Sequence, residues 1–196
     1  PTWDLVDPFD GRGDLARQVL RTPLGPETAF SEDPLRMLRA ARFVSRYSLS
    51  TEEELENAIL DMAPRIGIVS KERISDEMAK FLLVDQPGEG LALLQRTGLL
   101  SQIIPPLKRT GGIESEALDR IESEIPLRWA ALLWPFTQDE HQARQLLKEL
   151  RISKALSSRI GEIIDAASEL SMARNRQAST LRRLLYVTHP NMDSAL

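Results

Sequence analysis

An acidic and a basic side chain three residues apart, Asp33 and Arg36, have the types and spacing to recognise a ligand. Side chains three apart leave the same side of a helix, so both can face one molecule. The carboxylate accepts hydrogen bonds and the guanidinium donates them. Cytosine and adenine each place an amine donor beside a ring-nitrogen acceptor, and uracil and guanine present the reverse order. The pair can therefore accept C or A and reject U or G without a nucleic-acid template.

The segment that follows this pair has the pattern of an amphipathic helix. At 100° per residue, Arg36, Arg39 and Arg42 fall within an arc of about 120°, away from the apolar side chains. We expect the apolar side to pack against the protein and the arginine side to face a cleft. Since arginine binds phosphate through charge-assisted hydrogen bonds, Arg39 and Arg42 are candidates to hold phosphate or a neighbouring carboxylate. The apolar residues are Met37, Leu38, Ala41 and Val44.

The elements that must position these residues are predicted to be helices. Helical periodicity favours an all-α fold, a multi-helix array of two bundles joined near Pro105. The one expected strand is Val6–Phe9, a short remnant before the Gly11–Gly13 turn, and no strand pattern follows residue 10. Helices are expected at 15–20, 33–46, 50–62, 70–82, 91–97, 99–104, 114–123, 126–134, 139–150, 155–173 and 178–187.

Capping and breaking residues set the expected ends of these helices. Ser50 is interpreted as an N-cap in a capping box with Glu53, and Ser70 as a second N-cap. The expected breaks, where proline or glycine interrupts the pattern, are the Pro23–Pro26 loop, the Pro87–Gly90 segment and Gly98.

Composition narrows the class of protein. The 196 residues carry a formal net charge of −4 and no cysteine, which excludes disulfides and thiolate metal sites. No apolar run approaches the roughly 18 residues of a membrane span, and no secretory signal is visible. We therefore expect a cytoplasmic protein without a membrane partner. Because the chain begins with Pro1 rather than Met, we interpret it as a fragment.

Three motifs in order resemble those of one family. The segment 32–36 resembles the nucleotide-selecting motif Glu-Asp-x-x-Arg of bacterial tRNA nucleotidyltransferases, the CCA-adding enzymes, and of bacterial poly(A) polymerases. The segment 7–15 resembles the family's turn Asp-x-x-Gly-Gly-x-x-Asp-Leu, with Asp10 in place of the first glycine. The segment 69–77 resembles its helix start Val-Ser-x-Glu-Arg-Ile-x-x-Glu. Three ordered motifs are more specific than any one alone.

The resemblance implies the neck and helical body of an enzyme that adds C, C and A to tRNA from CTP and ATP, with Mg²⁺ in a catalytic head. The head's motifs would precede residue 1, so we predict that this chain contains no catalytic residue, binds no metal and is inactive alone. The family assigns base binding to Glu32, Asp33 and Arg36, and the helical face adds Arg39. The expected supporting residues, a helix-bracing pair and a head–neck hinge, are Arg73 and Glu77, and Asp7, Gly11 and Asp14.

The same resemblance suggests three parts of the chain. Residues 1–15 are a remnant of the head–neck connection, 16–104 the neck, and 105–196 a body that binds tRNA. Late basic side chains would give this body positive charge for tRNA phosphates, although the sequence does not identify which of them contact tRNA. They are Lys148, Arg151, Lys154, Arg159, Arg174, Arg176, Arg182 and Arg183.

Other interpretations stay open. The parent protein can be a poly(A) polymerase or an enzyme that adds only part of CCA, and the chain can be a non-catalytic RNA-binding or protein-interaction module. An Asp before Pro is also an ordinary N-cap, so an unrelated helical scaffold would have no cleft beside Arg36 and Arg39. A metal-dependent phosphohydrolase is rejected, because Trp134-Pro135 stands where a His-Asp pair is expected. The sequence does not indicate the oligomeric state.

Overall fold

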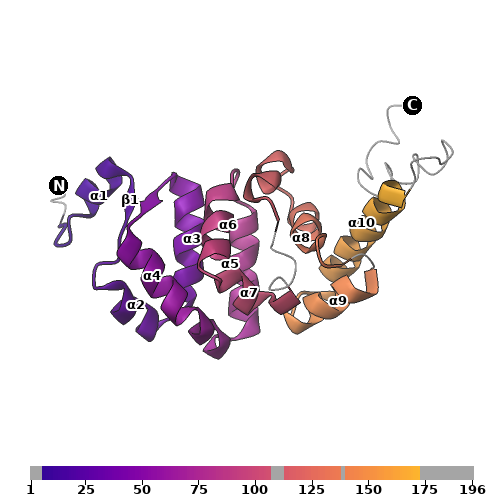
Figure 1. Ribbon diagram of the computed structural model, residues 1–196, viewed down its shortest axis with the longest axis horizontal. Coiled ribbons are helices and arrows are strands. Elements are labelled where there is room, and N and C mark those ends of the chain that lie inside the picture. The colour runs from indigo at the N-terminus through magenta and orange to yellow at the C-terminus, as the bar shows by residue number, and fades with distance from the viewer. Residues whose placement is uncertain (1–5, 107–112, 138–139, 173–196) are drawn as a thin grey trace, which may run out of the picture.

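The computed structural model of the chain describes residues 6–106, 113–137 and 140–172, and these confirm the predicted all-α fold. The elements follow one another from α1 at one end of the molecule to α9 and α10 at the other (Figure 1). The first half contains α1 (Gly11–Arg17), β1 (Val19–Leu20), α2 (Pro26–Glu32), α3 (Leu35–Tyr47), β2 (Ser50–Thr51), α4 (Glu53–Met62), η1 (Ala63–Ile68), α5 (Lys71–Leu82), α6 (Gly88–Arg96) and α7 (Leu99–Ile103). The second half contains η3 (Ser115–Arg120), α8 (Ile125–Leu133), α9 (Glu140–Glu149) and α10 (Lys154–Met172). The helix expected at 178–187 lies outside the described residues.

The predicted helix after the acid–arginine pair is confirmed as α3. Its apolar stripe, Met37, Leu38, Ala41 and Val44, is buried. The stripe packs against α5 and α6, which lie beside α3 in Figure 1. Gly90, expected to break a helix, lies inside α6 instead. A Cβ at this position would overlap the carbonyl oxygen of Ala41, so glycine permits the close approach of α6 to α3.

Two predictions about strands were wrong. Residues 6–9 form a turn rather than a strand. After residue 10, β1 and β2 pair in parallel, with Val19 opposite Ser50. Two-residue strands are too short to produce a period-2 pattern, so the sequence did not reveal them.

The prediction of a capping box at Ser50 was also wrong. The Ser50 hydroxyl donates to the carbonyl oxygen of Gln18 at 3.0 Å, as part of the strand pairing, and α4 begins after Glu52 without a side-chain cap. The Ser70 cap is confirmed, because its Oγ accepts the backbone N–H of Arg73 at 3.4 Å. Gly98 ends α6 in the left-handed region, at φ 70°, as predicted.

A buried arginine connects the second half to the first. Arg128 of α8 is 1% exposed. Its guanidinium donates to the carbonyl oxygens of Leu82 at 2.7 Å, Asp85 at 2.9 Å and Val84. It also donates to Ile121 at 3.0 Å. Arg128 therefore satisfies carbonyl groups where α5 ends, and buried side chains of both halves form one core cluster. The division into neck and body stays a prediction.

Candidate nucleotide-binding site

Asp33 lies between two helices rather than on the first turn of one. No helix was predicted between the Pro23–Pro26 loop and Asp33, but α2 begins at Pro26, a favoured first position. α2 ends at Glu32, and Asp33 has extended backbone angles of φ −145° and ψ 99°. The Asp33 carboxylate accepts the backbone N–H of Leu35 at 3.2 Å, and its carbonyl oxygen accepts that of Arg36 at 3.0 Å. Asp33 thus ends α2 and also satisfies N–H groups at the start of α3.

Asp33 and Arg36 each have a charged partner within the protein. Asp33 Oδ2 accepts a hydrogen bond from Arg73 Nη2 at 2.8 Å, from α5. Arg36 Nη1 donates to Glu32 Oε2 at 2.7 Å and to the Ala29 carbonyl oxygen at 3.2 Å. The Asp33 side chain is 24% exposed and that of Arg36 is 43% exposed. Both groups can therefore be reached from solvent, and their partners limit how they turn.

The buried carboxylate of Glu77, on α5, contacts three further basic side chains beside α3. This carboxylate, 2% exposed, lies 2.5 Å from Arg42 Nε, 3.8 Å from Arg39 Nε and 3.9 Å from Lys80 Nζ. Arg73 and Glu77 were predicted as a mutual i,i+4 pair, but each contacts charges of the α2–α3 segment instead. Lys80 was not anticipated, because its neighbourhood depends on how α5 packs.

We define the α3–α5 charge cluster by these eight side chains: Glu32, Asp33, Arg36, Arg39, Arg42, Arg73, Glu77 and Lys80. Five are basic and three are acidic, so the cluster has an excess of two positive charges. Such an excess favours an anionic ligand, and the acidic partners restrict where phosphate can bind.

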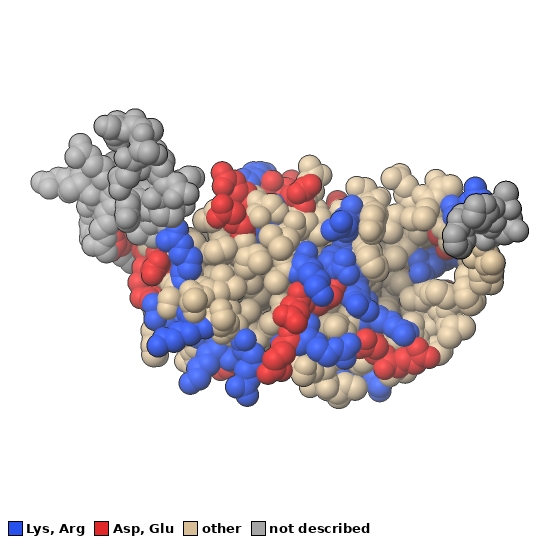
Figure 2. All heavy atoms as spheres, turned by 180° about the vertical axis from the view of Figure 1, so that it is seen from behind, with Lys and Arg blue, Asp and Glu red and all other residues tan. Residues whose placement is uncertain are grey.

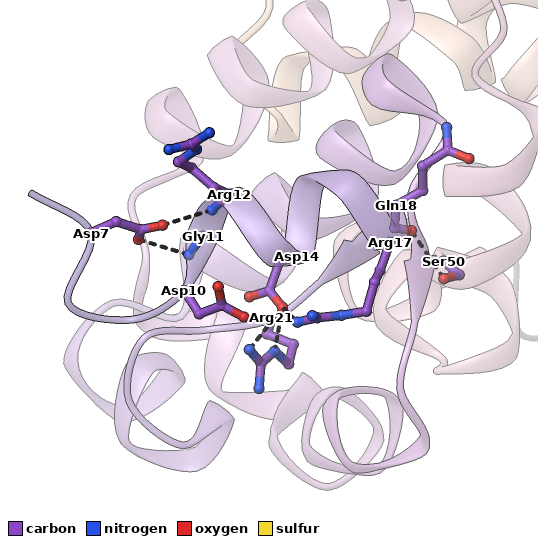
Figure 3. Close-up of polar contacts among 9 residues, drawn as sticks. All are labelled: Asp7, Asp10, Gly11, Arg12, Asp14, Arg17, Gln18, Arg21 and Ser50. Atoms are coloured by element: carbon purple, nitrogen blue, oxygen red, sulfur yellow. Dashed lines mark hydrogen bonds and ion pairs between the residues drawn. The ribbon is translucent and has the colours of Figure 1, made fainter. Parts of the chain in front are cut away.

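Asp7 positions the turn before α1 (Figure 3). Its two carboxylate oxygens accept the backbone N–H groups of Gly11 at 2.8 Å and Arg12 at 2.9 Å. These hydrogen bonds hold the pKa of Asp7 below its ordinary value, and the bond from the Arg12 N–H contributes most. Asp7 and Gly11 therefore define the start of α1 together, through donors that a helix N-terminus leaves unpaired.

Asp14 connects α1 to Arg21, the residue that follows β1. Its Oδ1 lies 2.7 Å from Arg21 Nη2 and 2.7 Å from Arg17 Nη2, as Figure 3 shows. Hydrogen bonds from Arg21 first, and then Arg17, lower the pKa of Asp14. Asp10, which replaces a family glycine, has φ 57° and so keeps the left-handed conformation that glycine adopts most readily. Asp7, Gly11 and Asp14 stay predicted hinge residues.

Basic side chains are interrupted by acidic ones on one face of the molecule (Figure 2). On the face drawn in Figure 2, Lys and Arg lie in several groups with Asp and Glu between them. A polyanion on this face would contact separate clusters.

No group of three or more His, Asp or Glu within the described part of the chain is arranged to hold a metal ion. In the same part, no helix is both long and apolar enough to cross a membrane.

Comparison with known proteins relates the chain to CCA-adding enzymes and to an RNA-binding family. The family described as "Probable RNA and SrmB-binding site of polymerase A" matches residues 49–110. A CCA-adding enzyme of Enterococcus faecalis is 32% identical over 167 residues, which cover 83% of this chain and 41% of that enzyme. One from Lactiplantibacillus plantarum is 32% identical over 174 residues, covering 85% of this chain and 42% of that enzyme. The chain is therefore similar to CCA-adding enzymes over more than four fifths of its length.

A solved member of the CCA-adding enzyme family has the same fold. The crystal structure of the Bacillus stearothermophilus CCA-adding enzyme in complex with CTP superposes with a TM-score of 0.71 at 27% identity. The match covers 94% of this chain and 50% of that one. The chain thus spans half or less of the CCA-adding enzymes that it resembles. The match to the RNA-binding family begins after Asp33 and Arg36 and includes Arg73 and Glu77.

Proposed function

We propose that this chain selects the nucleotide and binds tRNA in an enzyme that adds CCA to tRNA 3′ ends from CTP and ATP. One observation carries the proposal. Asp33 and Arg36 are partly exposed at the junction of α2 and α3, and each is oriented by a charged partner. The matches to CCA-adding enzymes support it.

The proposed recognition uses one acceptor and one donor. Asp33 accepts a hydrogen bond from the exocyclic amine of cytosine or adenine, and Arg36 donates one to the adjacent ring nitrogen. Arg73 keeps the Asp33 carboxylate oriented, and Glu32 does the same for Arg36. Uracil or guanine would place an acceptor against Asp33 and a donor against Arg36. A bidentate contact of this kind discriminates by about 1–3 kcal/mol.

The remaining parts of the site bind anions. Arg39 has one weak ion pair, at 3.8 Å, and is 47% exposed, so its guanidinium can turn toward a nucleotide phosphate. The family's reaction uses Mg²⁺, but no group of carboxylates within the described residues suits that ion. We therefore assign these residues to binding and orientation only.

Equilibrium binding of the four nucleoside triphosphates to the full chain tests the proposal. CTP and ATP should bind roughly 5- to 150-fold more tightly than UTP and GTP. Asp33→Ala should remove that preference, since the acceptor for the amine is lost. Asp76→Ala, at an exposed carboxylate on α5, is the control and should keep it. Equal affinities of the unmodified chain for all four nucleotides would contradict the proposal.

The same titration separates a second candidate. The matched family is described by its relation to polymerase A, so the chain can be the corresponding region of a poly(A) polymerase. That enzyme needs only ATP, so a preference for ATP over CTP would favour it. RNA binding without any nucleotide preference would favour a non-catalytic RNA-binding module.

A further inference from the structure

A cavity lies at the opposite end of α3 from Asp33. It has a volume of about 560 Å³ and separates the C-terminal end of α3 from the α5–α6 connection. Arg46 and Tyr47 line one side, and Leu83, Asp85 and Gln86 line the other. We call this cavity the Tyr47 pocket. It shares none of its lining residues with the α3–α5 charge cluster.

Buried hydrogen bonds hold both walls of the Tyr47 pocket. On the α3 side, the Ser45 hydroxyl donates to the Pro87 carbonyl oxygen at 3.1 Å and accepts the Gly90 N–H at 2.8 Å. On the other side, Arg128 donates to the carbonyl oxygens of Val84 and Asp85. The pocket is thus formed before any ligand arrives, which lowers the entropic cost of binding.

The lining residues suit a base and a phosphate. Tyr47 is 52% exposed, so one part of its ring is available for stacking. The Arg46 guanidinium carbon lies 5.8 Å from the centre of that ring. Among the described residues, no carboxylate forms an ion pair with Arg46, in contrast to Arg36, Arg39 and Arg42. A stackable ring beside an arginine available to phosphate is the combination that single-stranded nucleic-acid sites use.

The position of the pocket on α3 favours a strand over a free nucleotide. Arg36, Arg39, Arg42 and Arg46 follow one another at helical spacing, so they lie along one face of α3. Ten residues separate the first from the last, a rise of about 15 Å along the helix. This row of arginines, three of which also contact carboxylates, joins the proposed base-reading pair to the Tyr47 pocket. A polyanionic strand matches it better than a single phosphate group does.

We infer that the Tyr47 pocket binds one nucleotide of single-stranded RNA, whose base stacks on Tyr47 and whose phosphate contacts Arg46. The Asp85 carboxylate repels phosphate, so the base faces Asp85 and Gln86. The strand continues along the arginine row toward Asp33. The inference rests on the proposed function only in taking RNA as the ligand.

Binding of short single-stranded RNA to the full chain, followed by fluorescence anisotropy, tests the inference. Tyr47→Leu should weaken the affinity at least about fivefold, because a stacked base contributes strongly to such complexes. Arg46→Gln should weaken it and reduce the slope of log affinity against log salt by about 0.7, the value for one phosphate contact. The matched controls are Phe9→Leu, at another half-exposed aromatic residue, and Arg12→Gln, at another exposed arginine. Both controls should leave the affinity unchanged.

Two results would overturn the inference. In the first, Tyr47→Leu binds RNA within twofold of the unmodified chain while its melting temperature is unchanged. In the second, cytidine or adenosine monophosphate saturates the pocket as tightly as the oligonucleotide does, which would assign it to free nucleotides. The triphosphate preference at Asp33 is measured separately on the same variants. If that preference survives in a Tyr47→Leu chain with unaltered RNA affinity, only the inference fails and the proposed function stands.

Discussion

Glu77 and Arg128 are both almost fully buried charges, but their partners differ in kind. Glu77, 2% exposed, is surrounded by the cations Arg42, Arg39 and Lys80 beneath α3. Arg128, 1% exposed, donates to main-chain carbonyl groups where α8 meets the α5–α6 connection. Both arrangements offset the cost of taking a charge out of water.

The difference separates the candidate site from a structural junction. Of the cations around Glu77, Arg39 and Lys80 are 47% and 61% exposed, so the buried carboxylate positions positive groups that a ligand can reach. The partners of Arg128 are backbone carbonyl groups, which its guanidinium already occupies. Burial lowers the pKa of Arg128, and the nearby carboxylates of Asp119 and Asp85 oppose that shift. Among these two buried charges, only Glu77 has partners that a ligand can reach.

Replacing Arg128 should have the largest effect on stability. Arg128→Met leaves several buried carbonyl groups without donors and should lower the free energy of unfolding by about 3–5 kcal/mol. Urea denaturation followed by circular dichroism measures this. Arg120→Gln, at an exposed arginine on η3, should change stability by less than about 0.5 kcal/mol. If Arg128→Met lowers the free energy of unfolding by less than about 1 kcal/mol, water molecules replace the guanidinium as donors to these carbonyl groups.

Replacing Glu77 should have an intermediate effect of a different kind. Glu77→Gln removes the shared carboxylate, but Arg39 and Lys80 can turn to water, so we expect a loss of about 1–3 kcal/mol. The variant also gains one unit of positive charge beside α3, and its affinity for single-stranded RNA at low salt should rise. Glu72→Gln, on the same helix with a 66% exposed side chain, is the control. If Glu77→Gln alters stability and leaves RNA affinity equal to the control's, Glu77 has a structural role like that of Arg128.

The smallest effect is expected for an acid–arginine pair at the surface. Glu56 accepts hydrogen bonds from Arg96 at 2.6 and 2.8 Å, and this contact is the main cause that lowers the pKa of Glu56 from its ordinary 4.5. A lowered carboxyl pKa stabilises the fold above the unfolded-state pKa, and this contribution is lost as pH falls through the folded-state pKa. At pH 7, Glu56→Gln should therefore destabilise the fold by less than about 1 kcal/mol.

Denaturation at pH 7 and below pH 4.5 checks this prediction. The difference between the unmodified chain and Glu56→Gln should shrink toward zero in acid, as Glu56 becomes protonated. If Glu56→Gln destabilises the fold at pH 7 as much as Glu77→Gln does, solvent exposure does not determine how much an acid–arginine contact contributes to stability.

Local patterns predicted much of the fold correctly. The buried stripe of α3, the Ser70 cap and the Gly98 stop depend on residues within a few positions of each other, and all three are confirmed. The bend at Asp33 was missed, because Asp-Pro suits both an N-cap and an interhelical break. The strands β1 and β2 were missed because pairing between Val19 and Ser50 leaves no local pattern.

The types and order of residues were enough to establish which segments are helical, which faces are apolar and where charges of each sign lie. Helix propensity, capping and hydrophobic periodicity act over only a few neighbours, so they can be read along the chain. The choice of partner for each charge came from packing. The contact between Asp33 and Arg73 joins residues 40 positions apart in the sequence. The contacts of Arg42 with Glu77 and of Arg128 with Leu82 join residues 35 and 46 positions apart. Electrostatic attraction and hydrogen bonding depend on distance in space, and the packing of α3, α5 and α8 sets those distances.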